Sequence, residues 1–424
     1  MSVARVEEHD GRPSHRWQLQ IVVRLLAVLL LGSSGCAMGP RALLFNRQKY
    51  NESVARTNRE ELLLNLVRLR YGDTPEVLPI GSLTTQLSWD YSANASGAVG
   101  QDASNVLNLA GRAAFAERPT ISYAMPQKDV INGFLNPLTT ETLFVLTYTG
   151  SPAEEVMSLV VKNINKVENA MTAGGLTPEV APEFEEFRWL IHNVSELRRR
   201  RQLEVGRLQR LTPVADPVPR DSLTVADFQA AYENNYVYKP TDVNQTMVLN
   251  KKENATFLRF APEALYSEEY LEIVRILQLA PGLTRYELNL ALEGQLLDEQ
   301  IPSEGRREIL LSIRSLLEIM FFLSNGVDVP VAHVAKGLVT ITINDQGCPF
   351  DWQQVLDNRC RVLTSKQKPH QAAVAVKYRG HWFYIDDRDH TSKSTFILLR
   401  KIFALQVQAG GVESLPILTL PIGR

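Results

Sequence analysis

Two neighbouring segments of the chain alternate between apolar and polar residues without a break, and this alternation constrains the fold more than any other feature. The apolar positions of the first segment are Leu87, Trp89, Tyr91, Ala93 and Ala95. Those of the second segment are Leu107, Leu109, Gly111, Ala113 and Phe115. Successive side chains of a strand point to opposite faces, so a period of two predicts β-strands. A stretch containing Gly, Asp and Ser separates the segments, and we expect a long amphipathic β-hairpin near residues 85–118.

This predicted hairpin has three alternative environments. Its two arms of about ten alternating residues have the length and pattern of strands that cross a bilayer. A soluble sheet that packs one face on a core, or on a partner protein, shows the same pattern. The candidate residues for contact with a membrane or a partner are Leu87, Trp89, Tyr91 and Phe115. Small residues dominate the apolar face after Tyr91 and gain little from burial, which favours the packed or partner-facing alternatives.

Helical and strand-like patterns intermix along the rest of the chain, which predicts an α+β fold. One helix is expected to begin at Thr57, which forms a capping box with Glu60, and to end at Gly72. Its buried face is expected to carry Leu62, Leu66 and Leu69. A long helix is expected over residues 182–211 and another over residues 303–325, because both segments carry apolar residues at helical spacing. The segment "AVAVKYRGHWFYID" predicts a second, shorter hairpin.

Three prolines within residues 212–222 indicate a linker between two domains. The predicted order is a signal peptide at 1–35, a tether at 36–55, an N-terminal α+β domain at 56–211, the linker at 212–222 and a C-terminal α+β domain at 223–424.

The N-terminal region contains an apolar run that is too short to span a membrane. It extends over eleven residues, 21–31, whereas a spanning helix needs about 20. Arginines precede it and small residues follow it, as in a secretory signal peptide. The sequence "GSSGC" that follows, ending at Cys36, resembles the lipobox of bacterial lipoproteins.

The lipobox resemblance implies that the signal peptide is cut before Cys36 and that Cys36 carries the lipid, including palmitate. In that family Asp after the cysteine favours the inner membrane, and Ala37 stands here instead. The resemblance therefore implies a lipid-anchored protein of the cell envelope, at the periplasmic face of the outer membrane, with membrane lipid as a partner through Cys36.

Charge and cysteine content agree with an exported protein that does not bind nucleic acid. The chain has 45 Lys and Arg against 47 Asp and Glu, which leaves no basic excess for a phosphate backbone. Cys348 and Cys360 remain once Cys36 is lipidated, and an even pair in an oxidising compartment predicts a disulfide.

The densest polar cluster, "HWFYIDDRDHTSK", begins at His381 and has two interpretations. One is a hydrolytic or metal site that uses His381 with Asp386, Asp387, Asp389 and His390. The other is a polar turn, followed by a helix that Thr391 or Ser392 caps. His381 and the acids do not converge on one face of a strand, which favours the turn. We expect no catalytic residue, metal or cofactor.

These observations together predict a non-enzymatic envelope lipoprotein that binds or assembles with envelope proteins or with copies of itself. One alternative is an oligomeric outer-membrane channel or secretion component to which each subunit contributes the hairpin at 85–118. The other is a periplasmic hydrolase that uses the polar cluster at 381–391.

Overall fold

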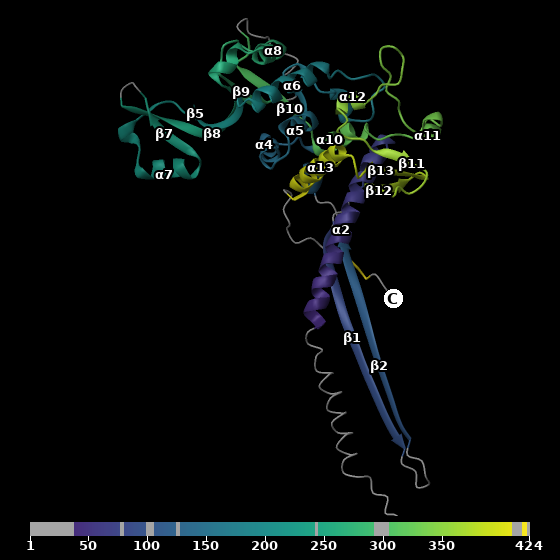
Figure 1. Ribbon diagram of the computed structural model, residues 1–424. Coiled ribbons are helices and arrows are strands. Elements are labelled where there is room, and N and C mark those ends of the chain that lie inside the picture. The colour runs from purple at the N-terminus through teal and green to yellow at the C-terminus, as the bar shows by residue number, and fades with distance from the viewer. Residues whose placement is uncertain are drawn as a thin grey trace, which may run out of the picture. The chain divides into compact units, whose positions relative to one another are not determined.

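The computed structural model describes residues 38–76, 80–98, 106–123, 128–241, 245–291, 305–408 and 418–421 (Figure 1). It shows an α+β protein whose sheets are mostly antiparallel, as the sequence predicts. The chain divides into two compact units, residues 1–61 and residues 62–424. The predicted signal peptide and Cys36 lie outside the described residues.

The first helix, α2 (Met38–Arg70), begins within the segment predicted as a tether. The segment predicted as a tether at 36–55 is therefore helical from Met38 on. Pro40 is compatible with this start, because proline is tolerated in the first turn of a helix. At the other end, Leu62, Leu66 and Leu69 are buried, which confirms the predicted face.

The predicted long hairpin is present and is longer than expected. It consists of β1 (Ile80–Ala98) and β2 (Val106–Tyr123), which pair antiparallel along almost their whole length. A third strand, β14 (Leu418–Pro421), pairs with the last residues of β2, Thr120–Tyr123.

The largest sheet has eight strands, in the order β4-β3-β10-β9-β8-β5 with β6 and β7 also paired to β8. Its strands are β3 (Val161–Ile164), β4 (Val167–Glu168), β5 (Leu203–Pro213), β6 (Val218–Pro219), β7 (Tyr236–Pro240), β8 (Thr246–Phe260), β9 (Arg285–Leu290) and β10 (Glu308–Ile313). A smaller sheet has the order β11-β13-β12 and consists of β11 (Leu363–Ser365), β12 (Ala372–Tyr378) and β13 (His381–Asp386).

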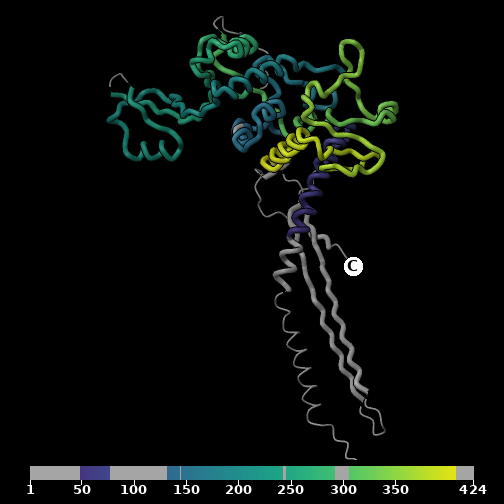
Figure 2. The backbone as a smooth tube through the Cα atoms, in the orientation of Figure 1, coloured from purple at the N-terminus to yellow at the C-terminus, as the bar shows by residue number. Residues whose placement is uncertain are grey.

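The helices among these strands are mostly short. They are α3 (Lys128–Leu135), α4 (Thr140–Tyr148), α5 (Ala153–Val160), α6 (Glu185–Arg199), α7 (Val225–Glu233), α8 (Glu268–Leu277), α10 (Leu316–Ser324), α11 (Val331–Ala335), α12 (Gln353–Leu356) and α13 (His390–Gln408). Single 3₁₀ turns are η2 (Met171–Gly174), η3 (Arg220–Ser222) and η4 (Pro262–Tyr266). The tube in Figure 2 shows α13, in yellow, following directly from the predicted β12–β13 hairpin.

The long helix predicted over 182–211 is wrong in its second half. The helix α6 ends at Arg199, and Arg201 adopts a positive φ of 60° that a right-handed helix cannot continue. The chain then forms β5, which pairs with β8 over eleven residues. Leu203 and Val205 fit a helical stripe and a strand equally well, so the long-range pairing decides between them.

The predicted domain boundary at 212–222 is also corrected by the sheet. That segment begins within the last two residues of β5 and contains β6, and both strands pair with β8, which lies beyond it in the sequence. One sheet thus takes strands from both sides of the proline-rich segment, and residues 62–424 form one compact unit.

The helix predicted over 303–325 contains a strand and a shorter helix instead. Residues 308–313 form β10 in the middle of the large sheet, and α10 begins only at Leu316. A central strand is buried on both faces, so its continuous apolar run resembles a buried helix. Ser315 marks the true helix start: its hydroxyl accepts from the Glu318 amide and Glu318 accepts in return from the Ser315 amide.

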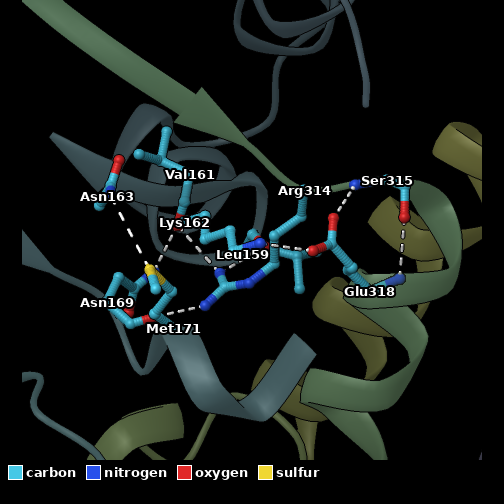
Figure 3. A network of polar contacts seen from close by, with 9 residues as sticks. All are labelled: Leu159, Val161, Lys162, Asn163, Asn169, Met171, Arg314, Ser315 and Glu318. Atoms are coloured by element: carbon cyan, nitrogen blue, oxygen red, sulfur yellow. Dashed lines mark hydrogen bonds and ion pairs between the residues drawn. The ribbon is translucent and has the colours of Figure 1, made fainter. Parts of the chain in front are cut away.

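Arg314, between β10 and α10, is completely buried and organises this part of the core (Figure 3). Its guanidinium donates to the backbone carbonyls of Leu159 at 3.1 Å, Val161 at 2.9 Å and Asn169. The ring of Phe322 lies 4.1 Å from the guanidinium carbon. Burial lowers the pKa of Arg314 to about 9, and the nearby charge of Glu318 opposes this shift. The side chain therefore connects these segments by donating to buried carbonyls, of which only that of Val161 has a second side-chain donor, Asn169.

Candidate functional site

The candidate functional site is the β1–β2 hairpin, whose register brings the two apolar patterns together. Trp89 pairs with Phe115, Tyr91 with Ala113, and Ala95 with Leu109. Directly paired positions of an antiparallel ladder lie on the same face. The predicted contact residues Trp89, Tyr91 and Phe115 therefore share one face, whereas Leu87 on that face pairs with Glu117.

The outer edges of this hairpin are largely unpaired in the part of the chain that the structure describes. β1 pairs with β2 and with no other described strand. β2 pairs on its other edge with β14 over four residues only. An unpaired edge presents backbone N–H and C=O groups that another strand can bind. A two-stranded hairpin is also only marginally stable by itself in water, so further contacts would stabilise it.

The acidic residues of the 381–391 cluster form a turn and a helix cap. Asp389 accepts hydrogen bonds from the Ser392 amide at 2.9 Å and from the Ser392 hydroxyl at 2.6 Å. Asp387 pairs with Lys393 at 2.7 Å, and this ion pair lowers the pKa of Asp387. Asp386 accepts from the Arg388 amide at 2.8 Å. The three carboxylates near the start of α13 thus form the turn, cap the helix and pair with a lysine, which are structural roles.

The structure separates His381 from these acids. His381 opens β13 and Asp386 closes it, so at about 3.3 Å per residue the two lie roughly 17 Å apart along the strand. The imidazole of His381 packs instead against His333 of α11, with ring centroids 4.8 Å apart. The imidazole of His381 therefore does not lie close enough to Asp387 or Asp389 for the two groups to act on the same substrate atom.

His381 belongs to an aromatic and polar cluster that the sequence analysis did not predict. Tyr71 lies at its centre, with its hydroxyl 2.6 Å from Nδ1 of His333 and its ring edge-to-face with Tyr378. The Tyr378 hydroxyl donates to Asp73, and Arg379 donates to the same carboxylate at 2.9 Å.

The electrostatics of this cluster favour neutral side chains at its centre. Burial raises the pKa of Tyr71 to about 12. Burial also lowers the pKa of His333, and the positive charges of His381, Lys336 and Arg379 lower it further. Hydrogen bonds from Tyr378 and Arg379 keep the pKa of Asp73 low. The cluster joins the end of α2 to α11 and to the β12–β13 hairpin. The sequence offers no local signal for it, because 262 residues separate Tyr71 from His333.

Cys348 and Cys360, which are predicted to form a disulfide, are both free thiols in the structure. Cys348 is exposed in a turn, where its amide donates to the Asn344 side chain at 2.9 Å. Cys360 is buried, and its thiol points to the Leu323 carbonyl at 3.8 Å. The backbone of Cys360 also packs on Gly326, where a Cβ would lie 2.2 Å from the Cys360 carbonyl oxygen. The two cysteines thus lie in different environments, one exposed and one buried, and the disulfide stays a prediction.

Among the residues that the structure describes, no group of three or more His, Cys, Asp or Glu side chains is arranged to hold a metal ion. No helix within the described ranges combines the length and apolar character needed to cross a bilayer.

Comparison with known proteins gives no relative. No protein-family model, no curated protein and no solved structure matches this chain.

Proposed function

We propose that this chain is a lipid-anchored component of the bacterial cell envelope that binds or assembles with other envelope proteins, or with copies of itself, through the β1–β2 hairpin. In this proposal Cys36 carries the lipid and holds the protein at the periplasmic face of the outer membrane.

The unpaired edges of the hairpin are the observation that carries the proposal. Among the described residues, strands of 19 and 18 residues leave far more backbone hydrogen-bonding groups without a strand partner on their outer edges than the four residues of β14 cover. Pairing with a strand of another chain would satisfy these groups. The register adds a face on which Trp89 and Phe115 are neighbours, and aromatic residues contribute strongly to protein interfaces.

The geometry gives less support to a hydrolase that uses the 381–391 cluster. Asp387 is engaged by Lys393 and Asp389 by Ser392, and His381 lies at the opposite end of β13. A catalytic pair would need the imidazole and the carboxylate within hydrogen-bond reach of a common reacting group.

The hairpin also favours a second candidate, an oligomeric outer-membrane channel or secretion component to which each subunit contributes one hairpin. A strand of 19 residues spans about 60 Å at about 3.3 Å per residue, roughly twice the hydrocarbon thickness of a bilayer. In that arrangement part of each strand would cross the bilayer and the remainder would extend beyond it.

Both candidates require the β1–β2 hairpin to contact another chain, and a photo-crosslinking experiment in cells tests this contact. A photoreactive phenylalanine analogue is placed at Trp89 or Phe115, and as a control at Tyr266, which is 88% exposed outside the hairpin. We expect discrete crosslinked products from the two hairpin positions and none from the control. Native mass in detergent then separates a self-assembled ring from a complex with a different protein. A hairpin that gives no crosslink at either position contradicts the proposal.

The anchor is tested separately by metabolic labelling with a fatty-acid analogue. The wild-type protein should be labelled and the Cys36→Ser variant should not. Equal labelling of both would show that Cys36 is not the site of lipidation.

A further inference from the structure

A small cavity with a partly polar lining lies where the helices α5, α6, α10, α12 and α13 meet (Figure 1). Its volume is about 50 Å³, which is room for roughly three to five water molecules at about 10–15 Å³ each. Arg188 and Asp357 line it and are exposed, so the cavity opens to the surface beside them. A small solute can therefore enter it.

A buried carboxylate without a cationic partner lines this cavity. Glu155 is only 5% exposed. Its carboxylate oxygens accept hydrogen bonds from the Ser394 hydroxyl at 3.1 Å and from the Thr395 hydroxyl at 3.0 Å. No Lys, Arg or His pairs with it among the described residues. Burial removes a carboxylate from water, so a cation beside it would offset the cost of the buried charge.

The side-chain oxygen of Asn169 is a second buried acceptor on the same cavity. Asn169 is 4% exposed, and its amide nitrogen donates to the Ser158 carbonyl at 2.8 Å and to the Val161 carbonyl at 2.7 Å. These two carbonyls fix the orientation of the amide, because an oxygen in place of the nitrogen would face both of them. Oδ1 is therefore directed away from them, and it has no hydrogen-bond partner among the described residues.

The two acceptors are neighbours, and a third lies beside them. Ser158, whose carbonyl holds Asn169, comes three residues after Glu155 in α5, and residues at this spacing share one side of a helix. Thr395 is 2% exposed and also lines the cavity. Its hydroxyl donates to Glu155, and the same oxygen can accept a hydrogen bond. The cavity thus offers a carboxylate, an amide oxygen and a hydroxyl oxygen.

The charged groups around the cavity leave one negative charge unbalanced. The lining contains three carboxylates and two guanidinium groups, a net charge of −1, from Glu154, Glu155, Asp357, Arg188 and Arg359. Arg359 pairs with Glu154 at 2.8 Å and with Asp357 at 3.0 Å. Arg188 donates to a backbone carbonyl at 3.4 Å instead. A cation of single charge would balance the lining, and Glu155 is the carboxylate that neither guanidinium pairs with.

We propose that this cavity binds the ammonium group of a small primary amine, with Glu155 as its counterion. The three N–H donors of an ammonium group equal in number the acceptors offered by Glu155, Asn169 and Thr395. A methylammonium or ethylammonium ion is of the size that the volume admits. The inference is independent of the hairpin, since neither β1 nor β2 contributes to the lining.

The remainder of the lining favours an amine over a hydrated metal ion. Phe187, Phe322 and Leu323 contribute apolar side chains to the cavity. The carbon atoms of an amine can pack against them, whereas the water molecules around a metal ion need polar partners on every side.

The test uses the full chain in a nonionic detergent and measures its thermal unfolding at increasing concentrations of methylammonium chloride. Tetramethylammonium chloride holds the ionic strength constant, because this cation is larger and has no N–H donor. A ligand that binds only the folded chain raises the midpoint in a saturable way, and we expect this for the wild type. Glu155→Gln should weaken the apparent affinity by about tenfold or more, because the ammonium group loses its charged partner. Val355→Trp, at a half-buried lining position, should remove the saturable rise by filling the cavity.

Glu185→Gln is the matched control, since it makes the same change at an exposed residue of α6 that does not line the cavity. It should bind methylammonium as the wild type does. A n-butylammonium ion has the length of a lysine side chain and distinguishes two sources of the ammonium group. Stronger binding than that of methylammonium indicates the lysine of a partner protein, and weaker binding indicates a free small amine.

Three results would overturn the proposal. The first is a wild-type protein whose midpoint does not rise in a saturable way. The second is equal affinity of Glu155→Gln and Glu185→Gln for methylammonium. The third is an equal, Glu155-dependent rise with sodium chloride in place of methylammonium chloride, which would identify a metal-ion site instead.

Discussion

The hydroxyl oxygen of Tyr71 lies 2.6 Å from Nδ1 of His333, and this contact joins the residue after α2 to α11 across 262 residues of sequence. His333 in turn packs against His381 at the start of β13. Because His333 is buried in the folded protein, folding changes how readily it binds a proton. The stability of the protein therefore depends on pH.

The first prediction is that the protein becomes less stable as the pH falls below about 6.5. Burial and nearby positive groups lower the pKa of His333 from its ordinary value of about 6.5. The unfolded chain therefore binds a proton at a pH where native His333 does not, so the free energy of unfolding decreases as the pH falls through that range. Urea midpoints measured between pH 7.5 and 5.5 should show this decrease. His333→Gln should flatten the slope, whereas His370→Gln, at an exposed position, should not. Identical slopes for wild type and His333→Gln would contradict the assignment.

The second prediction concerns the buried cation of Arg314. Replacing it with Met removes the side-chain donor of the Leu159 and Asn169 carbonyls and one of the two side-chain donors of the Val161 carbonyl. We expect a loss of about 3–5 kcal/mol in the free energy of unfolding, as for other buried polar groups that lose a charged partner. Arg388→Met, at an exposed position, is the control and should change stability by less than about 0.5 kcal/mol. Equal urea midpoints for Arg314→Met and wild type would show that the network does not stabilise the fold.

The third prediction is that the native, unreduced protein has one reactive thiol in the Cys348–Cys360 pair. Cys348 is exposed, whereas burial raises the pKa of Cys360 to about 12 and keeps it in the unreactive thiol form. A colorimetric thiol reagent should react quickly with one group, and Cys348→Ser should remove that reaction. Denaturant should expose the second thiol. An unfolded, unreduced protein with no thiol from this pair would show that a disulfide forms after all.

Local patterns were sufficient to predict the features that depend on neighbours in sequence. The β1–β2 hairpin follows from alternation that continues through both arms, and the buried face of α2 follows from Leu62, Leu66 and Leu69. The β12–β13 hairpin follows from its turn at Arg379 and Gly380, both of which have positive φ. In both hairpins the partner strand follows shortly after the first strand in the sequence.

Features that depend on distant pairing were missed. Leu203 and Val205 leave the helix because β8 pairs with them, and β8 lies more than 40 residues further along the chain. The Tyr71–His333–His381 cluster has no local signal at all. Arg314 did offer one: a lone arginine within the apolar run from Ile309 to Met320 indicates a buried cation, although its carbonyl partners cannot be read from the sequence.

The last prediction tests whether the apolar face of the hairpin is an assembly surface. Ala95 pairs with Leu109 on that face, and Asn94 pairs with Ala110 on the opposite face. Ala95→Arg would place a charge where the proposal puts a partner or lipid, and in lipid an arginine costs about 2–4 kcal/mol near the midplane. We expect this variant to fold but to lose its high native mass in detergent, or its co-purifying partner.

Asn94→Arg supplies the control, because it introduces the same charge one residue away on the polar face. It should assemble as the wild type does, and circular dichroism should show that both variants fold. If both variants assemble normally, the apolar face is solvated in the native protein and the hairpin does not act through it. If both fail to assemble, the charge itself is responsible rather than the face. Only a selective loss for Ala95→Arg agrees with a contact through the face that carries Trp89 and Phe115.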